Sequence, residues 1–475
     1  MEEAAFSPGP RQPKRRGISL AKAIVLGCIL AVLVLAVGGY FITLTLADRR
    51  LKAELRKLKA SGAPLTLLEA APRQVPPDEN AAVLYEQAFI GLPWGPDIRK
   101  VADFACPEEA KGRQVSVQDI EEILPRYQVT LRLLEQATER PACRFPVDWD
   151  AGYNATLAHL VEMRAAARLL AANALVDADH GNGNGNGNGK QAIESIELIL
   201  RMGDHLSPEP TLYSQLVRIH IQDIALTTLH RVVETSPVSV AEARRIYGTL
   251  RKIDNMRPFT RGLEGERCMG LWMFDAALQD RNEARELAEA GWGENPAIER
   301  RLLTSRLFGL WLPLLTQDKI LYLRQCNRVV ELSRKPYREV KHQYDALQRE
   351  AQDAPKYAVV TRRLSPAFLL PTISRDKAIA SVGVAQYGMA LRAYQEAVGR
   401  YPESLAELRA KIDWPLPSDP FSGKDFIYRR EGKGYLLYSI GPNMKDEGGK
   451  DRRSVTGPLP PGQEPPDDIA WRMSR

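Results

Sequence analysis

The longest uninterrupted apolar stretch of the chain lies near its N-terminus, between Ala23 and Ala47, where no charged residue occurs. At about 1.5 Å per residue, a helix of this length crosses a bilayer with some tilt. The alternative is a cleaved signal peptide, whose apolar core is normally shorter and is followed by a small-x-small cleavage site. Here the stretch continues through Tyr40 and Phe41, and a basic run then starts at Arg49. The pattern therefore predicts a retained transmembrane helix, which we place at residues 18–47.

The segments that flank this span are basic on both sides. Residues 1–17 contain three prolines and predict a disordered basic tail. Residues 48–77 predict a stalk and connector, in which the helix continues to about Ala60 and a Pro-containing segment follows. Because bases both precede and follow the span, charge alone does not decide which side of the membrane the body occupies.

Helical periodicity dominates residues 78–365. Ser116 with Asp119, and Ser239 with Glu242, have the spacing of capping boxes that begin helices. Short polar connections between the helical patterns indicate antiparallel neighbours. One predicted face carries small and apolar side chains at steps of three and four, namely Leu160, Met163, Ala167, Leu170 and Ala174. These features predict a multi-helix bundle or an irregular solenoid, without the fixed spacing of a tetratricopeptide repeat.

Two segments of this helical region allow alternatives. The Gly/Asn tract at 181–189 is low in complexity, and we interpret it as a tolerated surface loop rather than a functional one. The apolar passage Leu302–Leu323 has the length of a second span, but Arg306, Asp318 and Lys319 interrupt it. A buried core helix is therefore favoured there.

Residues 366–475 have a different pattern, which predicts a small α+β domain. An amphipathic helix from about Asp376 to Gly399 carries one apolar stripe, made of Val384, Tyr387, Leu391, Tyr394 and Val398. Ser404 with Glu407 predicts the start of a short second helix. Two strand-like segments, 426–428 and 435–438, are joined at 431–433 and predict an antiparallel hairpin against the long helix.

The order of turns in this region resembles the C-terminal domain of the major pseudopilins of type II secretion. The matching residues are Tyr401-Pro402, Asp419-Pro420, Tyr428, Tyr438-Ser439-Ile440-Gly441 and Asp467-Asp468-Ile469. The resemblance covers only about the last 100 of the 475 residues. The remainder resembles uncharacterised bacterial envelope proteins that have a membrane anchor and a helical body. Together these resemblances imply a bacterial inner (cytoplasmic) membrane location, with the C-terminal bulk outside the cytoplasm.

The resemblance also implies a calcium site, because the acidic loop of the pseudopilin domain binds calcium. Calcium takes six to eight oxygen ligands. Two departures favour the alternative, a solvated acidic loop: Pro442 replaces an expected Asp, and the longer loop carries Arg452 and Arg453. The positions that correspond to ligands are Ser439, through its carbonyl, and Asn443, Asp446, Asp467 and Asp468.

A second, weaker resemblance lies before the span. Gly17 to Lys22 has the outline of a prepilin peptidase site, but Lys22 stands where the family carries a Glu that serves subunit assembly. This departure, together with the large helical region, argues against a filament subunit.

Candidate catalytic residues are few. Ser374 and Lys377 have a serine–lysine spacing, but their partner motifs are missing and Ser374 is expected to cap a helix. His220 and Asp223 share a helix face and are either an acid–base pair or an interior hydrogen bond. We interpret a third group, Glu264, Glu266 and Arg267, as an internal ion pair rather than a site. No GxSxG, HExxH, P-loop or GxGxxG motif is present.

Composition changes this picture little. The chain has 65 Lys and Arg against 59 Asp and Glu, and its bases alternate with acids, which does not favour a nucleic-acid partner. Its five cysteines include no CxxC pair. Outside the span, Cys106, Cys143, Cys268 and Cys326 either pair in one of three ways or stay buried as thiols.

The sequence therefore predicts a mainly α protein with one transmembrane helix, an extracytoplasmic helical domain and a small pseudopilin-like α+β domain. The expected role is non-enzymatic, as a structural or interaction protein whose partners are the lipid bilayer and envelope or secretion-machinery proteins. One alternative is an accessory component of a type II secretion or type IV pilus-like machine. Another is an envelope enzyme with a polar cluster around His220, Asp223 and Glu266 in a concave pocket.

Overall fold

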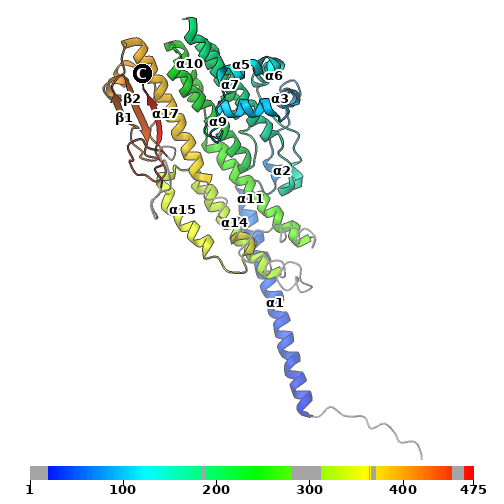
Figure 1. Cartoon of the computed structure of the whole chain (residues 1–475). Coiled ribbons are helices and arrows are strands. Elements are labelled where there is room, and N and C mark those ends of the chain that lie inside the picture. The colour runs from blue at the N-terminus through cyan, green and yellow to red at the C-terminus, as the bar shows by residue number, and fades with distance from the viewer. Residues whose placement is uncertain are drawn as a thin grey trace, which may run out of the picture.

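The computed structural model describes residues 20–184, 188–279, 312–362, 364, 371–451 and 465–474. The chain is mainly helical, with a small three-stranded antiparallel sheet near the C-terminus (Figure 1). Several predicted features lie outside the described residues: the tail 1–17, half of the segment resembling a peptidase site, residues 302–311, and Arg452 and Arg453.

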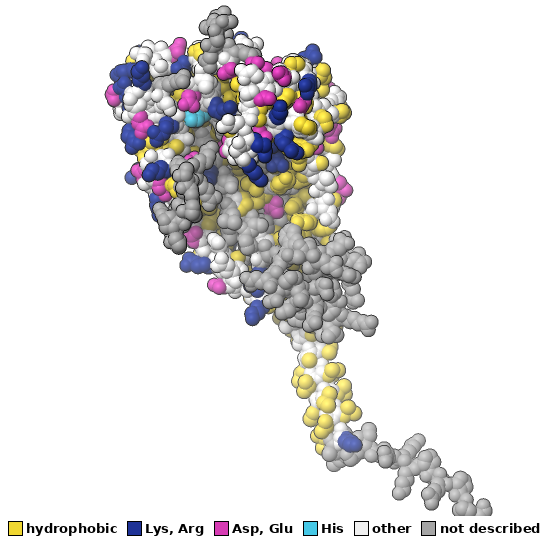
Figure 2. Space-filling view, in the orientation of Figure 1, with side chains coloured by type: hydrophobic (Ala, Val, Ile, Leu, Met, Phe, Trp, Pro, Cys, Tyr) yellow, Lys and Arg dark blue, Asp and Glu magenta, His cyan; other side chains and the backbone are white. Residues whose placement is uncertain are grey.

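The first helix, α1 (Leu20–Ala60), joins the predicted span to the body without a break. It is the one described helix that is long and apolar enough to cross a membrane. Along the predicted span its apolar side chains are exposed; Leu35, for example, is 75% exposed. Figure 2 shows this shaft projecting from the body with hydrophobic side chains along it.

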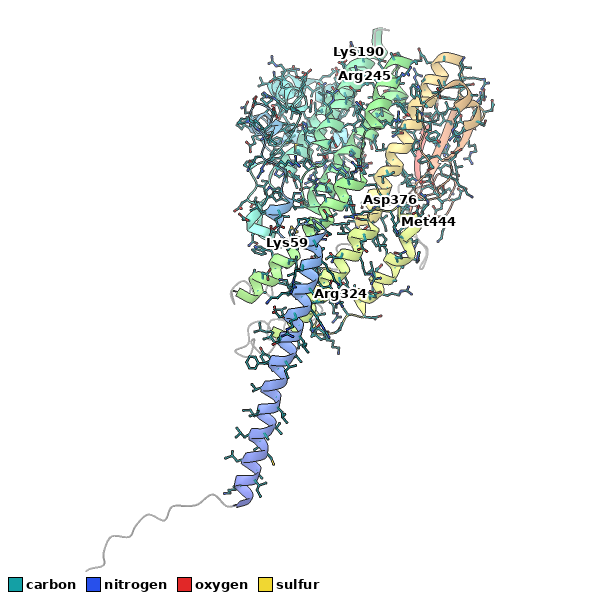
Figure 3. The ribbon with its side chains drawn as sticks, turned by 180° about the vertical axis from the view of Figure 1, so that it is seen from behind. Lys59, Lys190, Arg245, Arg324, Asp376 and Met444 are labelled. Atoms are coloured by element: carbon teal, nitrogen blue, oxygen red, sulfur yellow. The ribbon has the colours of Figure 1, made fainter. Side chains whose placement is uncertain are left out.

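The C-terminal end of α1 is part of the body. Leu58 packs with Leu271 of α11 (Met256–Gln279) and Leu323 of α14 (Leu312–Leu332). Glu54 pairs with Arg324 of α14 at 3.0 Å, and Figure 3 shows Arg324 beside this part of α1. The helix ends before Gly62, whose φ of +75° suits a glycine that terminates a helix. The apolar shaft of α1 and the body are therefore joined by packing as well as by the chain.

The remaining helices form one body above the shaft. They are α2 (Leu67–Ala70), α3 (Ala81–Ile90), α4 (Pro96–Ala105), α5 (Val117–Ile123), α6 (Gln128–Thr138), α7 (His159–Asn184), α8 (Gly189–Asp204), α9 (Leu212–Thr235), α10 (Val240–Leu250), α15 (Tyr337–Gln352), α17 (Pro371–Val398) and α18 (Leu405–Lys411), with 3-10 turns at Leu124–Tyr127 and Trp149–Asn154. Helices α7, α8 and α9 pack on one another, while α17 packs on α9 and α10.

Several predicted features of the helical region are confirmed. The stripe of α7 from Leu160 to Ala174 is buried, and both capping boxes begin helices, at Ser116 and at Ser239. The Gly/Asn loop is shorter than predicted, because α7 runs to Asn184 and α8 begins at Gly189. The described part of the passage Leu302–Leu323 lies in α14, where Leu323 is fully buried in the body.

The C-terminal region is a sheet that packs on α17. Strands β1 (Ile427–Glu431), β2 (Gly434–Ser439) and β3 (Ile469–Met473) are antiparallel in the order β1-β2-β3, and the sequence did not predict β3. A Cβ at Gly383 would lie 2.7 Å from Phe426, and a Cβ at Gly388 would lie 3.0 Å from Trp471. The absence of a side chain at these two glycines therefore allows the sheet to approach the helix. One hydrophobic cluster runs from α3 to β3, and the core is therefore continuous across the boundary predicted at 365/366.

A buried ion pair fixes the N-terminal part of α17. Arg375 and Asp376 are both fully buried, 2.5 Å apart, and Arg375 also donates to main-chain carbonyls of Ser333 and Lys335. Asp376 accepts from the main-chain N–H of Tyr337 at 2.6 Å. Burial raises the pKa of Asp376, and Arg375 opposes that rise. The pair ties α17 to the turn between α14 and α15, and Figure 3 shows Asp376 near the middle of the body.

Leu58→Ala tests the junction between the α1 shaft and the body. The change removes a side chain that packs between α11 and α14, and we expect it to lower the free energy of unfolding of the body by about 2–4 kcal/mol. Leu35→Ala, on the exposed part of the same helix, is the matched control and should leave that free energy unchanged. Denaturant unfolding of the detergent-solubilised chain, followed by tryptophan fluorescence, measures both. Equal effects would contradict the packing described here.

Candidate functional site

A cleft of about 480 Å³ lies between α9, α17 and the approach to β3. We call it the α9–α17–β3 cleft. Figure 1 places the three elements side by side in the part of the body away from the N-terminal half of α1. Three of the predicted candidate pairs, far apart in sequence, line this one cleft: His220 with Asp223, Ser374 with Lys377, and Asp467 with Asp468. The fold brings them together because α17 packs on α9 along one side and on β3 along another.

Lys377 bridges two walls of the cleft. Its ammonium group donates to Asp467 Oδ1 at 2.6 Å, across from α17 to the segment before β3. An ammonium that donates to a carboxylate has no lone pair with which to accept the proton of a serine hydroxyl. The geometry thus favours a structural or binding role for Lys377 over activation of Ser374. The prediction that Ser374 caps a helix is wrong, because α17 begins at Pro371 and Ser374 lies inside its first turns.

His220 is held near a carboxylate that the sequence did not indicate. Its Nε2 lies 3.5 Å from Glu109 Oε1, in the segment after α4, while Asp223 is exposed on the same helix. Burial lowers the pKa of His220, and Glu109 opposes that shift. At neutral pH the ring is therefore favoured in its neutral form, which offers one donor and one acceptor.

A further histidine, missed in the sequence, connects α9 with the sheet. His230 Nε2 donates to the main-chain oxygen of Arg472 at 2.8 Å, and its ring centroid lies 4.6 Å from that of Trp471. Together with His220, Asp223 and Thr227, it continues a polar stripe at steps of three and four along an otherwise buried helix. That stripe is a signal from which the residue could have been predicted.

The cleft carries buried polar atoms that have no hydrogen-bond partner among the described residues. They are Oε1 of Gln222 and Oδ1 of Asp468. Gln222 and Asp468 are each 2% exposed. An unpaired buried polar atom costs about 1–3 kcal/mol, so a group that supplies the missing hydrogen bond is favoured to bind. The arrangement therefore suits recognition through hydrogen bonds and charge.

Two of the predicted calcium ligands have protein partners of their own. Asp446 accepts from Tyr438 at 2.8 Å, and Asp467 pairs with Lys377. In the described part of the chain, no set of three or more His, Cys, Asp or Glu side chains is arranged to hold a metal.

Asp468 is the predicted ligand whose surroundings best fit a cation. Its Oδ2 accepts from the main-chain N–H groups of Glu447 and Gly449, at 3.1 and 2.8 Å. Burial, followed by the nearby Glu447 carboxylate, raises the pKa of Asp468 to about 7. Glu447 also accepts from the amide of Asn443 at 2.6 Å. Two adjacent carboxyl groups, one with a free buried oxygen, fit a hard cation. Sequence analysis had not identified Glu447.

The remaining candidate group is dispersed. Glu264 pairs with Arg334, while Arg267 donates to Asn327 and to the carbonyl of Pro64. Glu266 accepts from the main-chain N–H of Leu212 at 3.2 Å and does not line the cleft. The predicted internal ion pair among Glu264, Glu266 and Arg267 is therefore wrong, since the carboxylates and the guanidinium have different partners. Of the polar cluster proposed for an enzyme, only His220 and Asp223 share a cleft.

A second polar network lies in the core, outside the cleft. Glu209 accepts from His159 at 2.7 Å and from Ser214 at 2.5 Å, and Thr211 bonds Ser214 at 2.6 Å. The carboxylate, rather than the histidine, is at the centre, so the histidine is not placed to take the proton of Ser214. The described cysteines are all free thiols, and those outside α1 are buried. Both features fit roles in packing.

Comparisons of the chain with protein-family models, with curated proteins and with solved structures each find no match. The pseudopilin resemblance stays a prediction that rests on the residues quoted for it.

Glu266 is expected to make stability depend on pH. Burial raises its pKa from 4.5 to about 7, opposed by the hydrogen bond from Leu212. The folded state therefore holds the proton more tightly than the unfolded state, and stability is lost as pH rises between these values. Glu266→Gln keeps an acceptor for Leu212 and should be about 1–3 kcal/mol more stable than the natural chain at pH 8, with little difference at pH 4. Denaturant unfolding at the two pH values measures this, and equal differences at both would contradict the assignment.

Proposed function

We propose that this protein is a single-pass, membrane-anchored binding protein of the bacterial cell envelope. Its span lies in the inner membrane, its body stands outside the cytoplasm, and a partner is held in the α9–α17–β3 cleft. The observation that carries the proposal is the cleft itself, which gathers unpaired buried polar atoms from α9 and from the approach to β3. The continuous α1 supports the anchored part of the proposal, because it joins the apolar shaft rigidly to the body.

Binding is favoured over catalysis by the contacts of the candidate catalytic groups. Lys377 is engaged by Asp467, and His220 faces Glu109. A nucleophile needs a base within hydrogen-bond reach. Among the described residues that line the cleft, neither Lys377 nor His220 is paired with a nucleophile in this way. They do offer donors, acceptors and charges on three walls, which is what recognition of a polar partner needs.

A cysteine introduced at Thr227 tests the partner and the side of the membrane together. Thr227 lines the cleft, whereas Tyr213 on the same helix is 49% exposed and lies outside the cleft, so Tyr213→Cys is the matched control. We expect both cysteines to react with a membrane-impermeant maleimide photo-cross-linker applied to spheroplasts. After illumination, only Thr227→Cys should give a discrete adduct with a second polypeptide.

We expect little labelling of the native cysteines, because four of them are buried and Cys28 lies in the apolar span. Reaction that requires permeabilised cells would place the body in the cytoplasm and contradict the proposal. The same adducts from both positions would remove the cleft as the binding site. Recovery of pseudopilins or secretion-platform proteins would assign the protein to a secretion machine as an accessory component.

Calcium binding at Asp468 and Glu447 is a second proposal, favoured by the unpaired Oδ1 of Asp468. Asn443 and loop carbonyls would complete the oxygen ligands, and the bound cation would neutralise two adjacent carboxylates beside β3. We expect millimolar calcium to raise the melting temperature of the full chain in detergent relative to EDTA. At a hundredfold excess over Kd, linkage stabilises by about 2.7 kcal/mol.

Asp468→Asn should abolish the calcium shift, because it removes the carboxylate charge. Asp223→Asn, on the opposite wall of the cleft, is the control and should keep the shift. No rise in melting temperature at saturating calcium would dispose of the site.

A further inference from the structure

We propose that a second cavity, between the end of α1 and the helices α11 and α14, binds a phosphate group through the buried guanidinium of Arg267. We call it the α1–α11–α14 cavity. It has a volume of about 570 Å³ and is separate from the α9–α17–β3 cleft, since the described residues that line the two are all different. Three observations carry the inference: a buried cation without a carboxylate partner, unused hydrogen-bond donors, and a surplus of positive charge.

The α1–α11–α14 cavity forms where α1 meets the body. The last turns of α1 and the segment 61–64 make one wall, Arg267 of α11 makes a second, and Asn327 of α14 makes a third. Figure 3 labels Lys59, at the end of α1, and Arg324, on α14, in this part of the body. The cavity therefore lies beside the end of α1 that packs on the body.

The cavity is also close to the predicted span. Its first lining residue, Glu54, follows the last residue of that span, Ala47, by seven positions. At 1.5 Å per residue this is about 10 Å along the helix. The headgroup layer extends about 5–8 Å beyond the hydrocarbon core on each side. A lipid headgroup and a free phosphate in solution are therefore both sources of a phosphate group near this height.

Arg267 is a buried cation without a carboxylate partner. It is 2% exposed, and its terminal nitrogens donate to Asn327 Oδ1 at 3.2 Å and to the main-chain carbonyl of Pro64 at 3.1 Å. Both acceptors are uncharged, and both residues line the cavity together with Arg267. Burial of a charge is costly unless an opposite charge accompanies it. An anion that reaches this guanidinium is therefore favoured to bind.

The carboxylates nearest to Arg267 in the sequence have other partners. Glu264 pairs with Arg334 at 3.3 Å, and Glu266 accepts from the main-chain N–H of Leu212 at 3.2 Å. Among the described residues, no Asp or Glu forms an ion pair with Arg267. The protein itself thus leaves the charge of this guanidinium uncompensated in the part of the chain that is described.

Hydrogen-bond donors remain unused around the cavity. A guanidinium carries five N–H groups, of which Arg267 uses two, and its Nε is buried without a partner among the described residues. The amide nitrogen of Asn327 also makes no hydrogen bond to them. With Lys57 on α1, donors come from three walls. A tetrahedral phosphate accepts from several directions, so it suits this arrangement better than a planar carboxylate.

The charge of the lining favours an anion. The described lining residues include three cations and three carboxylates, namely Lys57, Arg267, Arg334, Glu54, Glu264 and Glu331. Glu54 pairs at 3.0 Å with Arg324, which lies outside the lining. With Arg324 counted, four cations face three carboxylates. Glu331 is exposed, and because water and salt screen an exposed charge, it offsets little of the attraction exerted by the buried Arg267.

Thermal unfolding of the delipidated full chain in dodecyl maltoside, a detergent without phosphate, tests the inference. Three ligands are compared: inorganic phosphate, phosphatidylglycerol in mixed micelles, and sodium acetate at the ionic strength of the phosphate sample. At a hundredfold excess over Kd, we expect the phosphate group to raise the melting temperature by about 3 °C. Acetate should not raise it. A rise with inorganic phosphate assigns the site to a soluble phosphate, and a rise with phosphatidylglycerol alone assigns it to a lipid headgroup.

Asn327→Asp supplies the missing carboxylate from the protein itself. The new side chain has nearly the same size, and the atom it charges already accepts from Arg267 at 3.2 Å. Without ligand, we expect this variant to melt at a higher temperature than the natural chain, because the buried guanidinium gains a partner. The rise caused by phosphate should be lost, because the site is then occupied by the carboxylate.

A second pair of variants tests the site from its rim, without a change in the core. The side chain of Lys57 is 75% exposed and lines the cavity, whereas Lys59, also exposed on α1, does not line it. Lys57→Gln should raise the Kd for phosphate by about threefold or more, and the matched control Lys59→Gln should leave it unchanged. Melting temperature measured against phosphate concentration gives both values.

No rise in melting temperature with either source of phosphate would overturn the inference. An equal rise with acetate, or a rise that Asn327→Asp retains in full, would also overturn it, because the effect would then come from salt or from another site. Equal Kd values for the Lys57 and Lys59 variants would remove the rim of the α1–α11–α14 cavity from the binding site and contradict the proposal in the same way.

Discussion

The arrangement of this protein depends on a buried ion pair at the start of α17. Arg375 and Asp376 have no exposed surface, and together they bond main-chain groups of Ser333, Lys335 and Tyr337. The guanidinium also lies 5.9 Å from the ring of Phe259 in α11. Two charges are stable in such a place only when each is paired and hydrogen-bonded. The pair therefore fixes where α17 begins relative to α11, α14 and α15.

From that fixed start, α17 runs between the helical bundle and the sheet. It packs on α9 and α10 on one side and on β2 and β3 on another, and small residues such as Ala385, Ala390 and Gly388 allow the close approach. The cleft is a consequence of this arrangement, because α9 and β3 both border α17. The continuous α1 then holds the whole body in one orientation relative to its apolar shaft, while Lys190 and Arg245 mark the opposite end (Figure 3).

The sequence predicted the parts that depend on local pattern. Residues close together in the sequence are enough to predict the apolar span, the capping boxes, the helix stop at Gly399 and the hairpin of β1 and β2. Strand β3 was missed because its five residues follow a long Pro-rich segment and their alternation is short. Ser374 was misplaced because α17 already includes residues 371–373, which the sequence analysis did not assign to the helix.

The candidate site was predicted only in fragments. His220, Ser374 and Asp467 were each noted, yet nothing local shows that they share a cleft, because their meeting depends on how α17 packs. Glu109 and Glu447 were missed for the same reason. Glu109 faces His220, and Glu447 bonds Asp468 through its main-chain N–H, and both partners are distant in the sequence. Gln222 appears only as a polar residue in a buried helix until its unpaired oxygen is seen in three dimensions.

Hydrogen exchange of the full chain in nanodiscs tests most directly the claim that one shared core builds the cleft. If α17 belongs to both the bundle and the sheet, its central amides exchange only by global unfolding, at the same slow rate as those of α9. Strand β2 should follow them closely. The opposite result, in which residues 371–474 exchange together and faster than α7 to α9, would mean that the C-terminal region opens as a separate domain and that the cleft is not a fixed part of the fold.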